Sequence, residues 1–128
     1  MALLWIGMGG ALGAIFRYLT ASTVFRWMGT AFPYGTLSVN LIGSFVIGLA
    51  YVFLVQQQWG SDHHKQLAMV GFLGAFTTFS TFSLESIALM QQQRWLAVAA
   101  YVGFSVFGCF LATGAGIALA NSLVRGQG

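Results

Sequence analysis

The chain has 128 residues, of which 58% are hydrophobic and 5% are charged. A soluble domain typically carries about 25% charged residues, so this composition excludes a soluble fold and indicates an all-α integral membrane protein. The formal net charge of +3 comes from five basic and two acidic residues scattered along the chain. Such a distribution does not form a nucleic-acid surface, and we expect no nucleic-acid partner. The single cysteine, Cys109, excludes an intrachain disulfide.

Four apolar segments match the length needed to cross a hydrocarbon core of about 30 Å. They occupy residues 2–25, 36–55, 66–90 and 95–123. We therefore predict a single domain, residues 1–128, with four transmembrane helices in a lipid bilayer. The first residues lack the basic region of a signal peptide, so we expect the first span to be retained.

The first two spans combine small residues with one arginine and one asparagine. Gly9 and Gly13 form a small-xxx-small pair, which predicts close helix packing. Arg17 lies within or at the end of the first span, where an unpaired arginine costs about 2.5–3.5 kcal/mol at mid-bilayer. It either snorkels to the interface or forms a cationic vestibule that attracts anions. Asn40, near the start of the second span, either bonds to a neighbouring helix or serves a ligand.

The loop after the second span holds two adjacent histidines, His63 and His64, a pair that can suggest metal binding. Neighbouring positions on a helix do not face the same way, and no other cluster of metal ligands lies near them in the sequence. We therefore expect a solvated loop rather than a metal site.

The third span contains the stretch from Gly71 to Ser83, which is rich in glycine, hydroxyls and phenylalanine. We expect the helix to be broken near Gly74–Thr78, because glycine and β-branched threonine weaken a helix. A bilayer tolerates a break only where the freed backbone groups face protein, water or an ion, so it indicates a binding site. Three phenylalanines recur at every third position: Phe76, Phe79 and Phe82. Ser80, Thr81 and Ser83 supply hydroxyl groups beside them. The alternative is a hydroxyl-rich helix that only packs against its neighbours.

Further polar groups lie near the end of the third span and along the fourth span. Glu85 is the only acid inside any span and either reaches the interface or pairs with a cation such as Arg17. Residues that recur every fourth position form a mildly polar stripe on the fourth span: Tyr101, Ser105, Cys109 and Thr113.

The basic residues do not specify one orientation in the membrane. With four spans, Lys65 and Arg125 lie on one side and Arg26 and Arg94 on the other, so no clear positive-inside bias results. Arg17 could tip this balance, depending on its depth in the membrane. A protein that inserts both ways and pairs antiparallel has this pattern, as a two-chain version of an inverted repeat. Four spans enclose little of a pathway alone, so we expect a homodimer.

The chemistry of the spans points to transport. The two acids lie far apart and no nucleophile, base and orienting group come together, so we expect no enzyme. Neutral donors and the positive edges of phenylalanine rings suit a small anion. A path for cations usually shows carboxylates or rings of carbonyls instead.

Three stretches carry a resemblance to a known family: GGALGAIFRY at 9–18, GTLSVNLIGSF at 35–45 and GFLGAFTTFSTFS at 71–83. Together with the four-span layout, the chain resembles the Fluc (CrcB) family of fluoride channels over its whole length. The resemblance implies a dual-topology antiparallel homodimer in the plasma (inner) membrane with two separate pores. Such a channel lets cytoplasmic fluoride leave passively and protects the cell from fluoride toxicity.

The resemblance also implies roles for residues. It implies a fluoride pore lined by Asn40, Phe79, Phe82, Ser80, Thr81, Tyr101, Ser105 and Thr113. A structural sodium ion at the dimer axis would be bound by the backbone carbonyls of Gly74 and Thr77 from each subunit. Arg17 and Glu85 would be vestibular or structural. Cys109 stands where a further hydroxyl is expected, and a thiol is a weaker donor.

Two other classes share parts of this pattern. A small dual-topology drug-export antiporter needs a membrane-embedded carboxylate, usually in the first span, whereas the acid here is Glu85 in the third span. A purely structural membrane subunit would leave the hydroxylated third span without a purpose. Ion flux driven by concentration alone, without a proton gradient, separates a channel from both.

Overall fold

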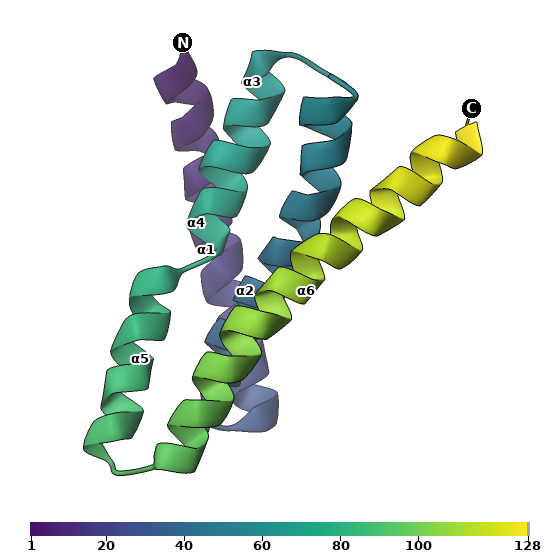
Figure 1. The fold of residues 1–128 in the computed structure, drawn as a ribbon. Coiled ribbons are helices and arrows are strands. Elements are labelled where there is room, and N and C mark those ends of the chain that lie inside the picture. The colour runs from purple at the N-terminus through teal and green to yellow at the C-terminus, as the bar shows by residue number, and fades with distance from the viewer. Residues whose placement is uncertain (128) are drawn as a thin grey trace.

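The fold is known from a computed structural model that describes residues 1–127 (Figure 1). The only proline, Pro33, stands at the N-cap of the second long helix, outside any helix interior, where its missing N–H does no harm. The described chain is built of helices and contains no strand, which confirms the all-α prediction. In chain order these are α1 (Ala2–Met28), α2 (Tyr34–Ala50), the π-helical η1 (Tyr51–Gln56), α3 (Asp62–Lys65), the π-helical η2 (Gln66–Leu73), α4 (Gly74–Phe76), α5 (Phe79–Gln91) and α6 (Trp95–Gln127).

Four helical stretches are long and apolar enough to cross a membrane, as predicted. They are Ala2–Met28, Tyr34–Gln56, Asp62–Gln91 and Trp95–Gly126. Each includes the segment expected from the sequence and extends a few residues beyond it, because hydropathy fixes the apolar run but not the helix ends.

The ends of these helices lie at two opposite ends of the molecule (Figure 1). Both termini and the connection from η1 to α3 lie at one end, and the connections from α1 to α2 and from α5 to α6 lie at the other. Lys65 and Arg125 therefore belong to one end, and Arg26 and Arg94 to the other. Two of the five basic residues thus lie at each end, and the fifth, Arg17, lies inside α1.

Helix α1 and η2 pack with their backbones in contact, as the pair Gly9 and Gly13 predicts. A Cβ added at Gly9 would collide with the carbonyl oxygen of Leu67, and one at Gly13 with that of Phe72. A Cβ added at Gly71 would lie 2.6 Å from the carbonyl oxygen of Ile6. Only glycine at these positions allows so close an approach. The first half of the third span is therefore fixed against α1.

Helix α6 crosses α2 near the middle of the molecule (Figure 1). Gly48 of α2 and Gly116 of α6 are both buried at the crossing. A Cβ at Gly48 would collide with the carbonyl oxygen of Thr113, and one at Gly116 with that of Phe45. This second glycine contact sets the position of α6 over α2.

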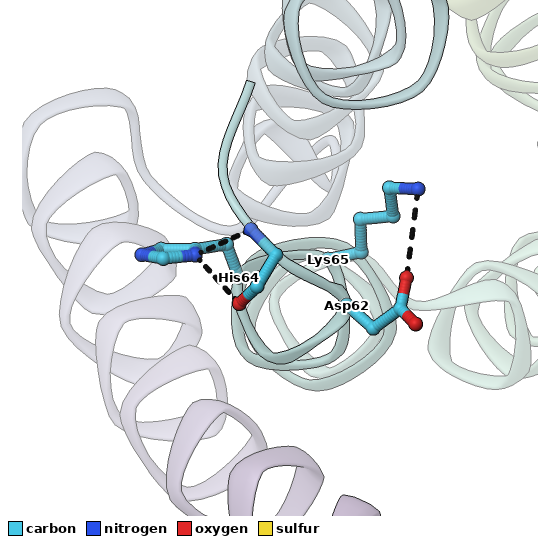
Figure 2. Close-up of polar contacts among 4 residues, drawn as sticks. Asp62, His64 and Lys65 are labelled. Atoms are coloured by element: carbon cyan, nitrogen blue, oxygen red, sulfur yellow. Dashed lines mark hydrogen bonds and ion pairs between the residues drawn. The ribbon is translucent and has the colours of Figure 1, made fainter. Parts of the chain in front are cut away.

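Helix α3 begins after Ser61, whose backbone and side chain both lie against the ring of His64 (Figure 2). Ser61 donates its backbone N–H to Nδ1 of His64 at 2.9 Å, and its hydroxyl lies 3.1 Å from the same nitrogen. Lys65 pairs with Asp62 at 3.8 Å. Three of these four residues are exposed and Lys65 is half-buried, so the segment is solvated as expected. Asp62–Lys65 nevertheless form a helical turn rather than the loop expected from the sequence.

Candidate functional site

Two residues in extended conformation, Thr77 and Thr78, separate α4 from α5. Thr77 has φ −85° and ψ 157°, and Thr78 has φ −149° and ψ 115°. The hydroxyl of Thr78 caps α5, because it accepts the backbone N–H of Thr81 at 3.2 Å and donates to Oγ1 of Thr81 at 2.9 Å. Sequence reasoning missed this role. A threonine directly before a helical run is the signal that could have revealed it.

Asn40 of α2 holds the backbone of Thr78 with both ends of its amide. Its Nδ2 donates to the carbonyl oxygen of Thr78 at 3.0 Å, and the N–H of Thr78 donates to Oδ1 at 2.7 Å. Asn40 therefore bonds to a neighbouring span, the first of the two roles left open by the sequence. The amide has a second N–H that these bonds do not use.

These bonds change the partners of two carbonyl groups. In a continuous helix the N–H of Thr78 would bond to the carbonyl of Gly74, and the N–H of Thr81 to that of Thr77. Here the first N–H goes to Asn40 and the second to the hydroxyl of Thr78. The carbonyls of Gly74 and Thr77 are thereby released from the helical ladder.

A groove of about 460 Å³ lies between α2, the Thr77–Thr78 segment and α6. This volume falls in the range of small-ligand sites. Four of the residues predicted for the fluoride pore line it together: Asn40, Phe79, Phe82 and Ser105. The remaining lining residues are Gly43, Ser44, Ile47, Leu73, Gly74, Thr77, Thr78, Val106, Cys109 and Phe110.

Phe79 and Phe82, two of the three phenylalanines that line the groove, differ in burial. Phe82 is buried, whereas the Phe79 side chain is 77% exposed. Their ring centroids lie 5.5 Å apart with the rings tilted by 56°. The ring of Tyr101 meets Phe82 edge-on at 5.1 Å. The groove therefore combines aromatic rings in offset orientations with the amide of Asn40.

Ser105 provides the one hydroxyl of the polar stripe that lines the groove. Its side chain is 6% exposed, and its oxygen has no hydrogen-bond partner among the described residues. A buried hydroxyl without a partner carries a free-energy cost, so the groove holds a donor set up for water or a ligand. No lining residue of this groove carries a formal charge.

The two ends of the polar stripe lie outside the groove lining. The hydroxyl of Tyr101, a fully buried residue, donates to Oε1 of Glu85 at 3.0 Å. The hydroxyl of Thr113 donates to the carbonyl oxygen of Ser44 at 3.0 Å. Both hydroxyls thus have protein acceptors, and Glu85 holds Tyr101 in place.

Arg17 lies at a second, smaller cavity of about 220 Å³, which it shares with Thr78 and Thr81. Its Nε is buried without a hydrogen-bond partner among the described residues. The sequence left open a pairing of Arg17 with Glu85, and residues 1–126 show no such ion pair, because Glu85 bonds to Tyr101. Ser80 is exposed and lines neither cavity.

Comparison with known proteins places the chain in one family. The family described as "CrcB-like protein, Camphor Resistance (CrcB)" matches residues 4–117. The chain is 49% identical over 122 residues to a protein of Hahella chejuensis, covering 95% of this chain and 96% of that one. It is 47% identical over 117 residues to a protein of Magnetococcus marinus, covering 91% and 95%, and 45% identical over 121 residues to one of a Sulfurovum species, covering 94% of each.

All three relatives are named "Fluoride-specific ion channel FluC". A family of ion channels confirms the expectation that the chain is not an enzyme. The four apolar helices of the chain and its similarity to ion channels both indicate a multi-pass integral membrane protein. The chain therefore belongs to the CrcB-like family.

Proposed function

We propose that this protein is a fluoride-selective channel, through which cytoplasmic fluoride leaves the cell passively and which protects the cell from fluoride toxicity. The observation that carries this proposal is the groove, where Asn40, Phe79, Phe82 and Ser105 come together. The names of the relatives point to the same ion.

The chemistry of the groove suits a small anion. Moving an unpaired small ion into a low-dielectric site costs tens of kcal/mol by Born reckoning, so the path has to replace water with donors. The free hydroxyl of Ser105, the second N–H of Asn40 and the positive edges of the rings are donors of this kind. No carboxylate lines the groove to favour a cation.

The ends of the path follow from the same arrangement. Arg17, with its buried Nε, and Thr81 form an entrance that attracts anions, and the exposed Ser80 lies beside Thr81. Tyr101 and Thr113 continue the line of Ser105 along α6. Glu85 has a structural role here, since it orients the hydroxyl of Tyr101.

The channel is an antiparallel, dual-topology homodimer in the inner membrane, with two pores for each dimer. Supporting this, the groove is open on the side of Phe79 and Phe110, which are 77% and 74% exposed. A second copy would complete the missing wall. The two basic residues at each end of the molecule favour insertion in both orientations.

The third span acts as a broken membrane helix, and the break serves a structural sodium ion at the dimer axis. The carbonyls of Gly74 and Thr77, released from the helical ladder, are the ligands. Oxygen atoms are the ligands that hard cations prefer. Two subunits would supply four carbonyls, and a bound cation would provide the partner that a bilayer requires for freed backbone groups.

The test is fluoride efflux from liposomes that contain the purified protein, driven by concentration alone, with chloride efflux measured in parallel. We expect rapid release of fluoride, little release of chloride and no need for a proton gradient. A well-folded protein that releases no fluoride would sink the proposal. Removing sodium from both sides is expected to weaken the dimer, as measured by mass photometry in detergent.

A further inference from the structure

Cys109 combines a reactive group with an open position in the groove. It is the only cysteine of the chain, is half-buried and lines the groove. Val106 and Phe110, on either side of it along α6, also line the groove and are exposed. No acidic, basic or histidine side chain lies among the described lining residues, so the sulfur of Cys109 is the one soft metal ligand there.

A second observation points to a ligand at the same place. Ser105 lies one helical turn before Cys109 on the same face of α6, and both line the groove. The oxygen of Ser105 is buried and lacks a partner among the described residues, although most buried hydroxyls have one. A small molecule or ion in the groove would meet this hydroxyl and the thiol together.

We propose that the groove wall at Cys109 and Ser105 is a modification site for small, neutral, thiophilic reagents of the organomercurial class, and that modification there closes the anion path. The second part of this inference depends on the proposed function. A neutral reagent suits the site because no charged side chain in the groove attracts a cation or an anion.

The reaction balances without an oxidant or a reductant. With methylmercury chloride, a bond forms between Sγ and mercury, the S–H and Hg–Cl bonds break, and a proton and a chloride ion leave. Thiolate is a ligand that selects soft metals. The product removes the S–H donor and places a methylmercury group beside the hydroxyl of Ser105.

The experiment uses the full chain in liposomes, treated with methylmercury chloride and followed by intact mass and by fluoride efflux. We expect one adduct per chain, a fall in fluoride efflux of at least about tenfold, as for a pore obstructed at a constriction, and recovery after a dithiol is added. The control is Cys109→Ser, or Cys109→Ala if the serine variant folds poorly. In this control the reagent should form no adduct, and fluoride efflux should be the same before and after treatment.

A matched variant separates the groove from the rest of α6. Leu111 is 74% exposed, lies outside the groove lining and stands about 200° around the helix from Cys109. The double variant Cys109→Ser, Leu111→Cys should form the adduct with no loss of efflux. An equal loss in this variant, an adduct on Cys109 without loss of efflux, or no adduct on the folded protein would each overturn the inference.

The failure of the proposed function is distinguishable from the failure of this inference. Absence of fluoride efflux before treatment would contradict the proposed function and the closing of a path. The adduct mass would still report whether Cys109 is a modification site.

Discussion

The two halves of the third span meet the rest of the molecule in opposite ways. The first half, η2, touches the backbone of α1 at Gly9, Gly13 and Gly71. The second half, α5, leaves Phe79 77% exposed and Leu84 71% exposed. The change occurs at Thr77–Thr78, where the backbone is extended.

This difference assigns a separate task to each half. Backbone contact at three glycines fixes the first half and leaves no space there for a ligand. The second half carries two of the three phenylalanine rings of the groove, and its open face is the surface on which we propose that a second copy packs. Asn40 joins the two, because it bonds to the backbone at the point of change.

The largest expected effect on stability comes from disrupting the contact between α1 and η2, the first half of the third span. In Gly13→Val, the new side chain collides with the backbone of Phe72, and neither backbone can move far. We expect the free energy of unfolding to fall by at least about 3 kcal/mol, the upper end of the usual cost of overpacking. Thermal unfolding in detergent measures this.

Gly7→Val on the same helix is the matched control, since no atom lies within 4 Å of a Cβ at Gly7. Equal melting temperatures for the two variants would contradict the close contact of α1 with η2.

The Thr77–Thr78 segment, where the two halves of the third span meet, should show the next largest effect on stability. Asn40→Ala removes both bonds to the backbone of Thr78 and leaves its N–H and carbonyl without those partners. We expect a loss of about 1–3 kcal/mol in stability, together with a loss of fluoride efflux. Asn121→Ala, the same chemical change on α6, is the control. A variant at Asn40 with unchanged stability would show that the amide does not hold the segment.

A smaller change tests the hydrogen bond by which α6 meets the second half of the third span. Tyr101→Phe keeps the ring against Phe82 and removes the hydroxyl that donates to Glu85. We expect a cost of about 0.5–1.5 kcal/mol. Glu85→Gln keeps an acceptor for the hydroxyl and should cost less than Tyr101→Phe in the same unfolding assay. The reverse order would argue against the positioning role of Glu85.

The smallest effect is expected at the start of the packed half. Ser61→Ala removes the hydroxyl of the exposed cap on α3 (Figure 2). Exposed caps lie at the low end of measured values, so we expect a loss of about 0.5 kcal/mol. Hydrogen exchange of the amides of residues 62–65 should rise locally, while efflux stays the same. A global loss of stability would contradict this.

The sequence predicted the four spans because length and apolar composition suffice to define a membrane helix. It also indicated Asn40, Phe79, Phe82 and Ser105, which the structure gathers around one groove. It did not predict that Asn40 bonds to Thr78, because the two residues are 38 positions apart and only tertiary packing brings them together.

Thr113 illustrates a second limit of sequence reasoning. A period of four places a hydroxyl on one face of a helix but does not say which neighbour it meets. The structure has this hydroxyl donating to the carbonyl of Ser44, where α6 crosses α2.

The most direct test of the account compares one phenylalanine pair from each region. The double variant Phe79→Ile, Phe82→Ile alters the groove, where the centroids of these two rings lie 5.5 Å apart. Phe16→Ile, Phe72→Ile alters a pair in the packed region with a centroid distance of 5.7 Å. With both proteins shown to be folded, we expect fluoride efflux to fall at least about 100-fold for the first variant, equal to about 2.7 kcal/mol, and to change little for the second. Efflux that persists in the groove variant, or falls equally in both, would contradict it.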